Sequence, residues 1–433
     1  MNAARTTTLL VVAAAAVMLI TTGIRQVSGL FVLPIISTTG MSIASVSLAL
    51  AIGQFVWGAM QPVFGALADN YGAFRIVMFG AVLLAVGCVL TAFAHSELTL
   101  IATMGVLSAA GAAAGSFSIL IGGTARRLEP HQRSTAAGTI NAGGSLGQFV
   151  FAPIAQATIA AWGWTAAMMT LAGAALATIP LALPLKKPSI AGRLREEAPA
   201  RAAEGESYGA PTHSVDSSTQ SVGTSAQRKH PTLREQLRIA ARDPSYILLN
   251  IGFFTCGFHV AFLVTHFPGE IQNCGLLPSV AANSIAIIGL FNVAGSIGVG
   301  MLGQRFRMKY LLALIYGARA LMIAIYLLMP KTSLNIYLFA AGMGMTWLAT
   351  VPPTSGIVSK LYGVRYLGTL FGLTLVSHQT GAFLGAWLGG VAMARLHSYQ
   401  WIWFADMALA LGAALSNLPI REEKPLPRPA VAA

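Results

Sequence analysis

Charged side chains are scarce in this sequence: Lys, Arg, Asp and Glu make up 9% of its 433 residues, and only 14 residues are acidic. Soluble domains carry about 25% charged residues, so this chain has too few to cover a water-soluble globule of its size. Cysteine is scarce too, and Cys88, Cys256 and Cys274 show neither a close pair nor a metal-ligand spacing. We therefore expect lipid to be the main solvent of the chain.

Motifs for nucleotide and metal chemistry are missing as well. The sequence has no phosphate-binding loop, no metal-ligand cluster and no ATP-binding segment. It also lacks the ten-residue alternation of apolar and polar residues that marks the strands of a membrane β-barrel. No cofactor is therefore implied, and any work done across a membrane must draw on an existing gradient.

Long apolar runs dominate what is present, and hydrophobic residues make up 55% of the chain. The runs begin near residues 9, 43, 75, 98, 133, 164, 245, 280, 310, 333, 367 and 400. Most extend for about 20 to 27 residues, which is enough for one tilted crossing each. Because backbone amides need internal partners in lipid, we predict an all-α membrane protein with twelve transmembrane helices.

The sequence is an internal duplication with an offset of 234 residues. Gly23-Ile24-Arg25 stands nine residues before Pro34, and Gly257-Phe258-His259 stands nine residues before Pro268. The same offset pairs Gly122 with Gly356, Arg126 with Lys360, Gly138 with Gly372, Gly147 with Gly381 and Phe149 with Phe383. We predict two six-helix bundles related by a pseudo-twofold axis, with polar groups of both halves near mid-bilayer, as in a transporter.

The formal charge of +13 does not indicate a nucleic-acid partner. The positions of the basic residues instead indicate how the chain is oriented in the membrane. With a cytoplasmic N-terminus, only Lys331 and Arg395 fall in outer loops, and Arg25 and Arg319 fall within spans. The positive-inside rule then predicts that both termini are cytoplasmic. Arg5 and the apolar residues after it also imitate a signal peptide, but the apolar region continues through Pro34, which is too long for one.

Between the halves the composition turns polar. We predict an N-terminal bundle over residues 1–185, a partly disordered cytoplasmic linker over 186–243, a C-terminal bundle over 244–420 and a cytoplasmic tail over 421–433. Thr232 and Glu235 form a capping box that predicts a short helix ending before Pro244. Its arginines repeat every four residues, so it either lies on anionic lipid or is a solvated helix.

The loop after the second run, GALADNYGAFR from Gly65 to Arg75, resembles the G-x-L-A-D-r-x-G-r-r loop of the major facilitator superfamily. The second half contains a partial copy of this loop, GMLGQR from Gly300 to Arg305, in which Gln304 replaces the acidic residue. The resemblance implies a latch at the inner face that is dominated by the first half. The residues expected to control this inner gate are Gly65, Asp69, Gly72, Arg75, Arg126 and Arg133.

Four further segments resemble the bacterial branch related to monocarboxylate and oxalate-formate porters: residues 115–122, 141–148, 252–259 and 375–385. This resemblance implies a bacterial inner-membrane protein that works as a monomer. The first span departs from typical monocarboxylate porters, because Thr22-Gly-Ile-Arg-Gln26 replaces their acidic residue, glycine and aromatic residues. The glycine repeat of drug exporters is incomplete, since Phe151-Ala-Pro153 replaces its Gly-Pro step.

Arg25 is the first candidate for a functional side chain. An arginine at mid-helix costs about 2.5 to 3.5 kcal/mol on insertion scales, so it must face a partner or a wet cavity. Guanidinium stays charged and binds carboxylate in a two-pronged geometry, which suits a small organic acid. The alternative is a structural arginine bonded to helix carbonyls.

His259 occupies the matching position in the second half, and histidine titrates near physiological pH. His259 and His378 are the candidates for proton coupling, and a packing role is the alternative for both. Asp406 and Arg319 lie in spans that the resemblance makes peripheral, so we expect structural roles for them. The residues predicted to bind substrate are Arg25, His259, Asn141, Gln148, His378, Gln379, Gln54 and Asn292.

An enzymatic pattern, G-x-S-x-G, occurs at residues 143–147. It needs a strand-turn-helix that this apolar helix cannot supply, and the Gly143 and Gly147 pair also serves close helix packing. We therefore predict a non-enzymatic secondary transporter of a small organic anion, coupled to protons and working by alternating access. The alternatives are a proton-antiport exporter of a larger metabolite, drug or siderophore and, in another class, a membrane-embedded enzyme or sensor.

Overall fold

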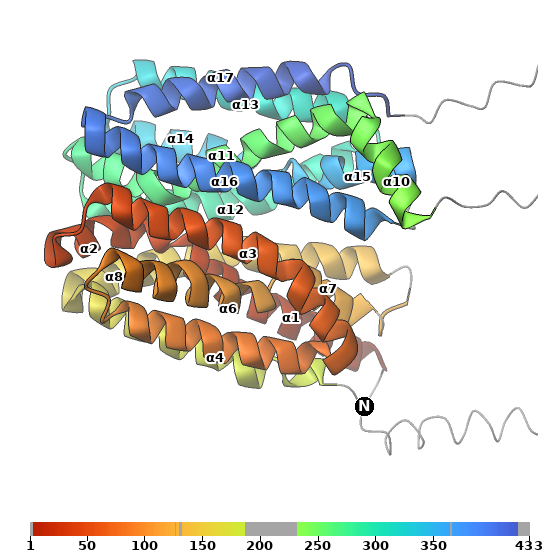
Figure 1. Ribbon diagram of the computed structural model, residues 1–433, viewed down its shortest axis with the longest axis horizontal. Coiled ribbons are helices and arrows are strands. Elements are labelled where there is room, and N and C mark those ends of the chain that lie inside the picture. The colour runs from red at the N-terminus through yellow and green to blue at the C-terminus, as the bar shows by residue number, and fades with distance from the viewer. Residues whose placement is uncertain (1–2, 126, 130–131, 187–231, 364–365, 423–433) are drawn as a thin grey trace, which may run out of the picture.

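The computed structural model describes residues 3–125, 127–129, 132–186, 232–363 and 366–422, and this part of the chain is helical without any strand (Figure 1). The first half contains α1 (Ala3–Gln26), η1 (Ser28–Phe31), α2 (Val32–Thr39), α3 (Ile43–Tyr71), α4 (Ala73–Thr91), α5 (Glu97–Leu100), η2 (Ile101–Ser108), α6 (Ala109–Ala114), α7 (Phe117–Ala125), α8 (Arg133–Leu181) and η4 (Leu183–Leu185). The remainder contains α10 (Leu233–Arg242), α11 (Pro244–Asn273), α12 (Pro278–Leu302), α13 (Met308–Leu328), α14 (Ser333–Thr346), α15 (Val351–Tyr362), α16 (Leu367–Leu396) and α17 (Gln400–Asn417).

These helices make the twelve crossings that the apolar runs predict. Nine described helical segments are long and apolar enough to cross a membrane, and one of them, Thr135–Leu181, contains two crossings. The chain bends between these two at Gly163, whose φ of 82° lies in the left-handed region that glycine adopts readily. Helices α16 and α17 complete the set, so the predicted all-α membrane fold is confirmed.

The two halves repeat the same helix packing. A Cβ added at Gly147 of α8 would lie 2.0 Å from the carbonyl oxygen of Leu19 in α1. A Cβ added at Gly381 of α16 would lie 2.0 Å from the carbonyl oxygen of Phe254 in α11. Only glycine permits such backbone contact. The first and fifth crossings of each half therefore pack alike, as the duplication predicts.

The two bundles meet through two equivalent pairs of helices. Helix α3 packs along α16, and α8 packs along α12, so the second crossing of each half contacts the fifth crossing of the other. Figure 1 shows α3 beside α16 between the red-to-yellow and the green-to-blue bundle. This exchange of contacts is the predicted pseudo-twofold arrangement.

The bundle interface is closed at one end and open at the other. Near the start of α3, a Cβ added at Gly390 would lie 2.3 Å from Ser47, so the two helices touch. Toward the side where the chain begins, Gly65 of α3 and Gly372 of α16 have nothing within 4 Å of an added Cβ. Gly138 of α8 and Gly300 of α12 are equally open. The bundles thus separate toward the N-terminal side of the molecule.

Helix α10 begins with the predicted capping box. Thr232 Oγ1 accepts from Glu235 N at 3.4 Å, and the Glu235 carboxylate accepts from Thr232 N at 2.8 Å. These hydrogen bonds lower the pKa of Glu235. The helix buries Gln236 and Ala240 and packs against α11. Residues 187–231 and 423–433 lie outside the described residues, so the domain boundaries and the lipid contact of this helix stay predictions.

Candidate functional site

Arg25, near the end of α1, is held by two residues of α3. Its Nη1 donates to Gln54 Oε1 at 2.5 Å, and its guanidinium carbon lies 4.1 Å from the ring centroid of Trp57. Neither partner is negatively charged, and Arg25 Nε has no hydrogen-bond partner among the described residues. A cation over an aromatic ring gains about 0.5 to 2 kcal/mol, less than the cost of placing it in a span. Arg25 therefore has unused capacity to bind an anion.

A pocket within the first bundle receives this guanidinium. It offers about 60 Å³ to the centres of water molecules. Its lining is mostly apolar and holds no acidic side chain: Ile24, Arg25, Ser28, Phe31, Leu50, Gly53, Gln54, Leu84, Cys88, Thr91, Met104, Ser108, Ala109, Ala112, Met168 and Leu171. The pocket therefore has room for ordered water or a small solute beside the guanidinium.

Predicted polar residues also lie at the interface between the bundles. Asn292 Nδ2 of α12 donates to Ser145 Oγ of α8 at 2.8 Å. At the pseudo-symmetric position, Gln379 of α16 covers Gly58 of α3, whose added Cβ would lie 2.1 Å from Gln379 Cγ. Gln148 is buried near Gly289 in the same α8–α12 contact. Three of the predicted substrate residues therefore lie on the surface where the bundles meet.

Asn292 also forms a hydrogen bond to the backbone at a break in the tenth crossing. Between α14 and α15 the backbone of residues 347–350 is not α-helical. Asn292 Oδ1 accepts from the amide of Leu348 at 3.0 Å and from Ser296 Oγ at 3.1 Å. Backbone groups freed by a helix break need such partners inside a membrane. The interface contact to Ser145 is therefore tied to the conformation of this break.

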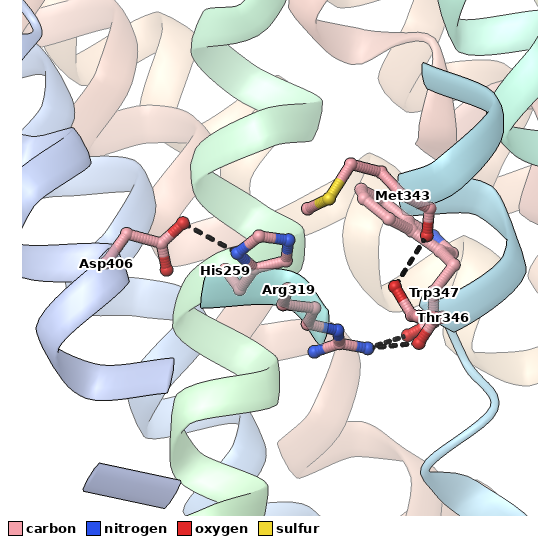
Figure 2. Close-up of polar contacts among 6 residues, drawn as sticks. All are labelled: His259, Arg319, Met343, Thr346, Trp347 and Asp406. Carbon is pink, nitrogen blue, oxygen red and sulfur yellow. Dashed lines mark hydrogen bonds and ion pairs between the residues drawn. The ribbon is translucent and has the colours of Figure 1, made fainter. Parts of the chain in front are cut away.

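His259 lies inside the second bundle, away from the pocket of Arg25. Its Nδ1 donates to Asp406 Oδ2 of α17 at 2.6 Å, and both side chains are fully buried (Figure 2). His259 Nε2 and Asp406 Oδ1 have no hydrogen-bond partner among the described residues. The histidine ring lies 6.3 Å from the ring of Trp347. The substrate contact predicted for His259 stays a prediction, and the observed partner is a carboxylate.

Arg319 of α13 also donates hydrogen bonds to the backbone at this helix break. Its Nη2 donates to the carbonyl oxygen of Thr346 and, at 2.6 Å, to that of Trp347 (Figure 2). The guanidinium thus lies at the C-terminal end of α14, where the helix dipole favours a cation. Arg319 is buried, and its Nε and Nη1 have no partner among the described residues. The contacts agree with the structural role expected for Arg319.

The other two histidines of the spans have different surroundings. His378 is buried at the contact between α11 and α16, with its ring 4.9 Å from that of Phe253. His266 Nε2 donates to the carbonyl oxygen of Ala386 at 2.7 Å. Among the described residues, neither histidine is hydrogen-bonded to a carboxylate. Asn141, the remaining predicted site residue, is half-buried in α8.

The predicted inner gate is only partly described. Gly72 joins α3 to α4 with a φ of 92°, a conformation that favours glycine, and Arg75 is exposed. Arg126 and the side chains of Asp69 and Arg133 lie outside the described residues, so the latch stays a prediction. On this side Arg127 donates to the carbonyl oxygens of Pro184 and Leu185 at 2.9 and 3.0 Å, and partial burial lowers its pKa.

The sequence patterns did not identify three residues as parts of these sites. The only sequence pattern that contains Ser145 is G-x-S-x-G. In the structure Ser145 lies within α8 and accepts a hydrogen bond from Asn292. Trp57 was not singled out. Asp406 is expected to be structural, yet a carboxylate buried in a span needs a partner. That need indicates that Asp406 has a partner, and the structure identifies the partner as His259.

Two six-helix bundles, interrupted crossings and buried polar side chains at the bundle interface define a membrane transporter. The chain belongs to the Major Facilitator Superfamily, whose family model matches residues 10–386.

Relatives agree with this assignment. The chain is 24% identical over 373 residues to monocarboxylate transporter 13 of Rattus norvegicus, covering 85% of this chain and 78% of that protein. It is 24% identical over 388 residues to the oxalate:formate antiporter of Oxalobacter formigenes, covering 88% and 82%. A crystal structure of a D-xylose-proton symporter matches with a TM-score of 0.72 at 13% identity, covering 95% and 97%. The latter likeness concerns the fold alone.

Proposed function

We propose that this protein moves a small organic anion of the monocarboxylate kind together with a proton across a bacterial inner membrane. The observation that carries the proposal is Arg25, a cation in an apolar pocket whose only hydrogen-bond partner among the described residues is the neutral Gln54. A carboxylate would supply the missing charge and accept two hydrogen bonds from the guanidinium. The names of the relatives, a monocarboxylate transporter and an oxalate:formate antiporter, support the same substrate class.

The pocket beside Arg25 can hold a small solute. About 60 Å³ is open there to the centres of water molecules, which leaves space for a carboxylate of a few heavy atoms. With the termini in the cytoplasm, the separation of Gly65 from Gly372 opens the bundle interface to the cytoplasmic side. Alternating access then requires the bundles to close there and to part near Ser47 and Gly390. The protein works as a monomer in this scheme.

The test is transport by the purified protein in liposomes that enclose a pH dye. A panel of small carboxylates, dyes, drugs and siderophores is added under an imposed pH gradient, and empty liposomes give the background. We expect protein-dependent proton influx with at least one small carboxylate. Proton release that occurs only with the larger compounds would replace this proposal with the exporter, and movement of neither class would contradict both.

A further inference from the structure

Three buried polar side chains from three helices gather in the second bundle. His259 comes from α11, Asp406 from α17 and Arg319 from α13, and each is at most 1% exposed. Figure 2 shows Asp406 and His259 joined by their hydrogen bond, with Arg319 reaching toward the turn at Thr346 and Trp347. The anion pocket of Arg25 involves none of them.

The His259–Asp406 pair has the chemistry of a one-proton site. With a neutral imidazole, the charges of Asp406 and Arg319 balance within the cluster. A proton taken up at His259 Nε2, the nitrogen without a partner among the described residues, gives an imidazolium held by the carboxylate at 2.6 Å. The cluster then carries one net positive charge in a low-dielectric interior, where charges interact strongly. Only the carboxylate makes that charge tolerable.

The other titratable groups near the pair come from each neighbouring element. On α11 itself, the thiol of Cys256 lies 3.2 Å from Thr350 Oγ1 at the helix break. On α13 the ring centroid of Tyr316 lies 5.5 Å from the guanidinium carbon of Arg319, and His378 faces Cys256 from α16. Asp406 is the one acidic side chain that the structure shows bonded to any of these groups. It is therefore the carboxylate that would balance the charge of a proton at His259.

The break in the tenth crossing connects this cluster to the bundle interface. Arg319 holds the carbonyls of Thr346 and Trp347, and the next residue, Leu348, donates its amide to Asn292. Asn292 in turn donates to Ser145 of the other bundle. Each step is a direct hydrogen bond or a covalent neighbour. A change in the position of Arg319 is therefore passed to the contact between the bundles.

We propose that His259 and Asp406 are the proton-binding site of the transporter, and that their charge controls the bundle interface through Arg319 and the α14–α15 break. This inference rests on the proposed proton-coupled function. An imidazolium at His259 repels the Arg319 guanidinium, which loosens its hold on Thr346 and Trp347. The break then releases Asn292 from Ser145, and the open conformation described here becomes less populated.

The experiment measures the opening of the interface without any substrate. A cysteine at Gly372→Cys, in a Cys274→Ser background, is labelled with a maleimide in nanodiscs between pH 5.5 and 8.5. Cys88 and Cys256 are buried and give little background. His95→Cys, on an exposed loop, corrects for the ionisation of the thiol itself. We expect the corrected rate to fall at least about fivefold on acidification, the lower end of usual coupling between sites.

Two substitutions and a matched control locate the response. His259→Gln and Asp406→Asn should flatten the pH profile, whereas His266→Gln, a buried histidine on the same helix without a carboxylate partner, should keep it. Asn292→Ala leaves the pair intact and should flatten the profile too, which covers any failure of the first two variants to fold. A pH-independent rate in wild type, or an unchanged profile in the folded His259 and Asp406 variants, would overturn the proposal.

A transport assay separates this inference from the proposed function. In liposomes, Asp406→Asn should still exchange the carboxylate across the membrane but should no longer accumulate it under a pH gradient. If wild type moves no carboxylate while labelling follows the pair, the anion assignment alone fails. If Asp406→Asn accumulates carboxylate as wild type does, the proton site is wrong and the anion assignment stands.

Discussion

Asn292 and Ser145 are hydrogen-bonded across the two bundles, with Nδ2 and Oγ 2.8 Å apart. An offset of 234 residues takes Ser145 to Gln379 and Gly58 to Asn292, so the contact of Gln379 with Gly58 is its pseudo-symmetric counterpart. The interface thus has one hydrogen-bonded contact and one packed contact at equivalent places. Both lie between the closed end of the interface and the end where the bundles separate.

Loss of the Ser145 hydroxyl should favour conformations in which the bundles part here. A side-chain hydrogen bond between membrane helices is worth about 0.6 kcal/mol on average, so Ser145→Ala should shift the conformational populations about threefold. The labelling rate of Gly372→Cys at constant pH measures this shift, which we expect to be a decrease. Ser118→Ala is the control, because Ser118 bonds to Gln61 within the first bundle. Equal rates in the two variants would refute this role of the contact.

Substitution by alanine should lower the stability of the protein at glycines in backbone contact but not at glycines beside open space. Gly147→Ala and Gly381→Ala place a Cβ 2.0 Å from a carbonyl oxygen, and overpacking of this kind costs about 1 to 3 kcal/mol. Gly138→Ala and Gly372→Ala meet open space and should be neutral or slightly stabilising, since alanine favours helix. Thermal unfolding in detergent compares all four. Similar Tm values throughout would contradict the packing described here.

The crossings, their number and the duplication were predictable from the sequence, because lipid demands long apolar runs and glycines mark backbone contacts. The glycine pair Gly147 and Gly381 shows this most clearly, since both positions pack as the offset implies. The length of an apolar run and the spacing of glycines can be read within one helix. Their recurrence at a fixed offset can be read by comparing the two halves.

The partners of the buried charges were not predictable, because the duplication does not extend to them. The offset places Ile288 at the position of Gln54, and Ala172 at the position of Asp406. Arg25 and His259 therefore occupy equivalent places but have unrelated neighbours. Which polar side chain meets which depends on how distant helices rotate against one another, and a sequence pattern within one helix does not contain that information.

Removal of Arg319 should destabilise the second bundle. Arg319→Met leaves the carbonyls of Thr346 and Trp347 without their donor, and each unsatisfied buried group costs about 1 to 3 kcal/mol. The Tm in detergent should fall clearly, while Arg395→Met, at an exposed arginine, should leave it unchanged. A Tm equal to that of wild type would show that Arg319 does not support the break.

A fixed carboxylate beside Arg25 should displace the substrate. In Gln54→Glu the new acid lies where Gln54 Oε1 now accepts from the guanidinium, so it forms an internal ion pair. The protein should fold normally but lose carboxylate uptake by more than tenfold in liposomes. Gln54→Ala, which leaves the guanidinium without this partner, should retain uptake. Full activity of Gln54→Glu would mean that the substrate does not bind at Arg25.

The measurement that tests the central claim most directly is uptake of a labelled small carboxylate by liposomes that contain wild type, Arg25→Ala, Arg25→Lys or Arg395→Ala. We expect uptake to be lost in Arg25→Ala, strongly reduced in Arg25→Lys because an ammonium lacks the two-pronged geometry, and unchanged in Arg395→Ala. Carboxylate uptake at the wild-type rate in folded Arg25→Ala would contradict the assignment of Arg25 as the anion site.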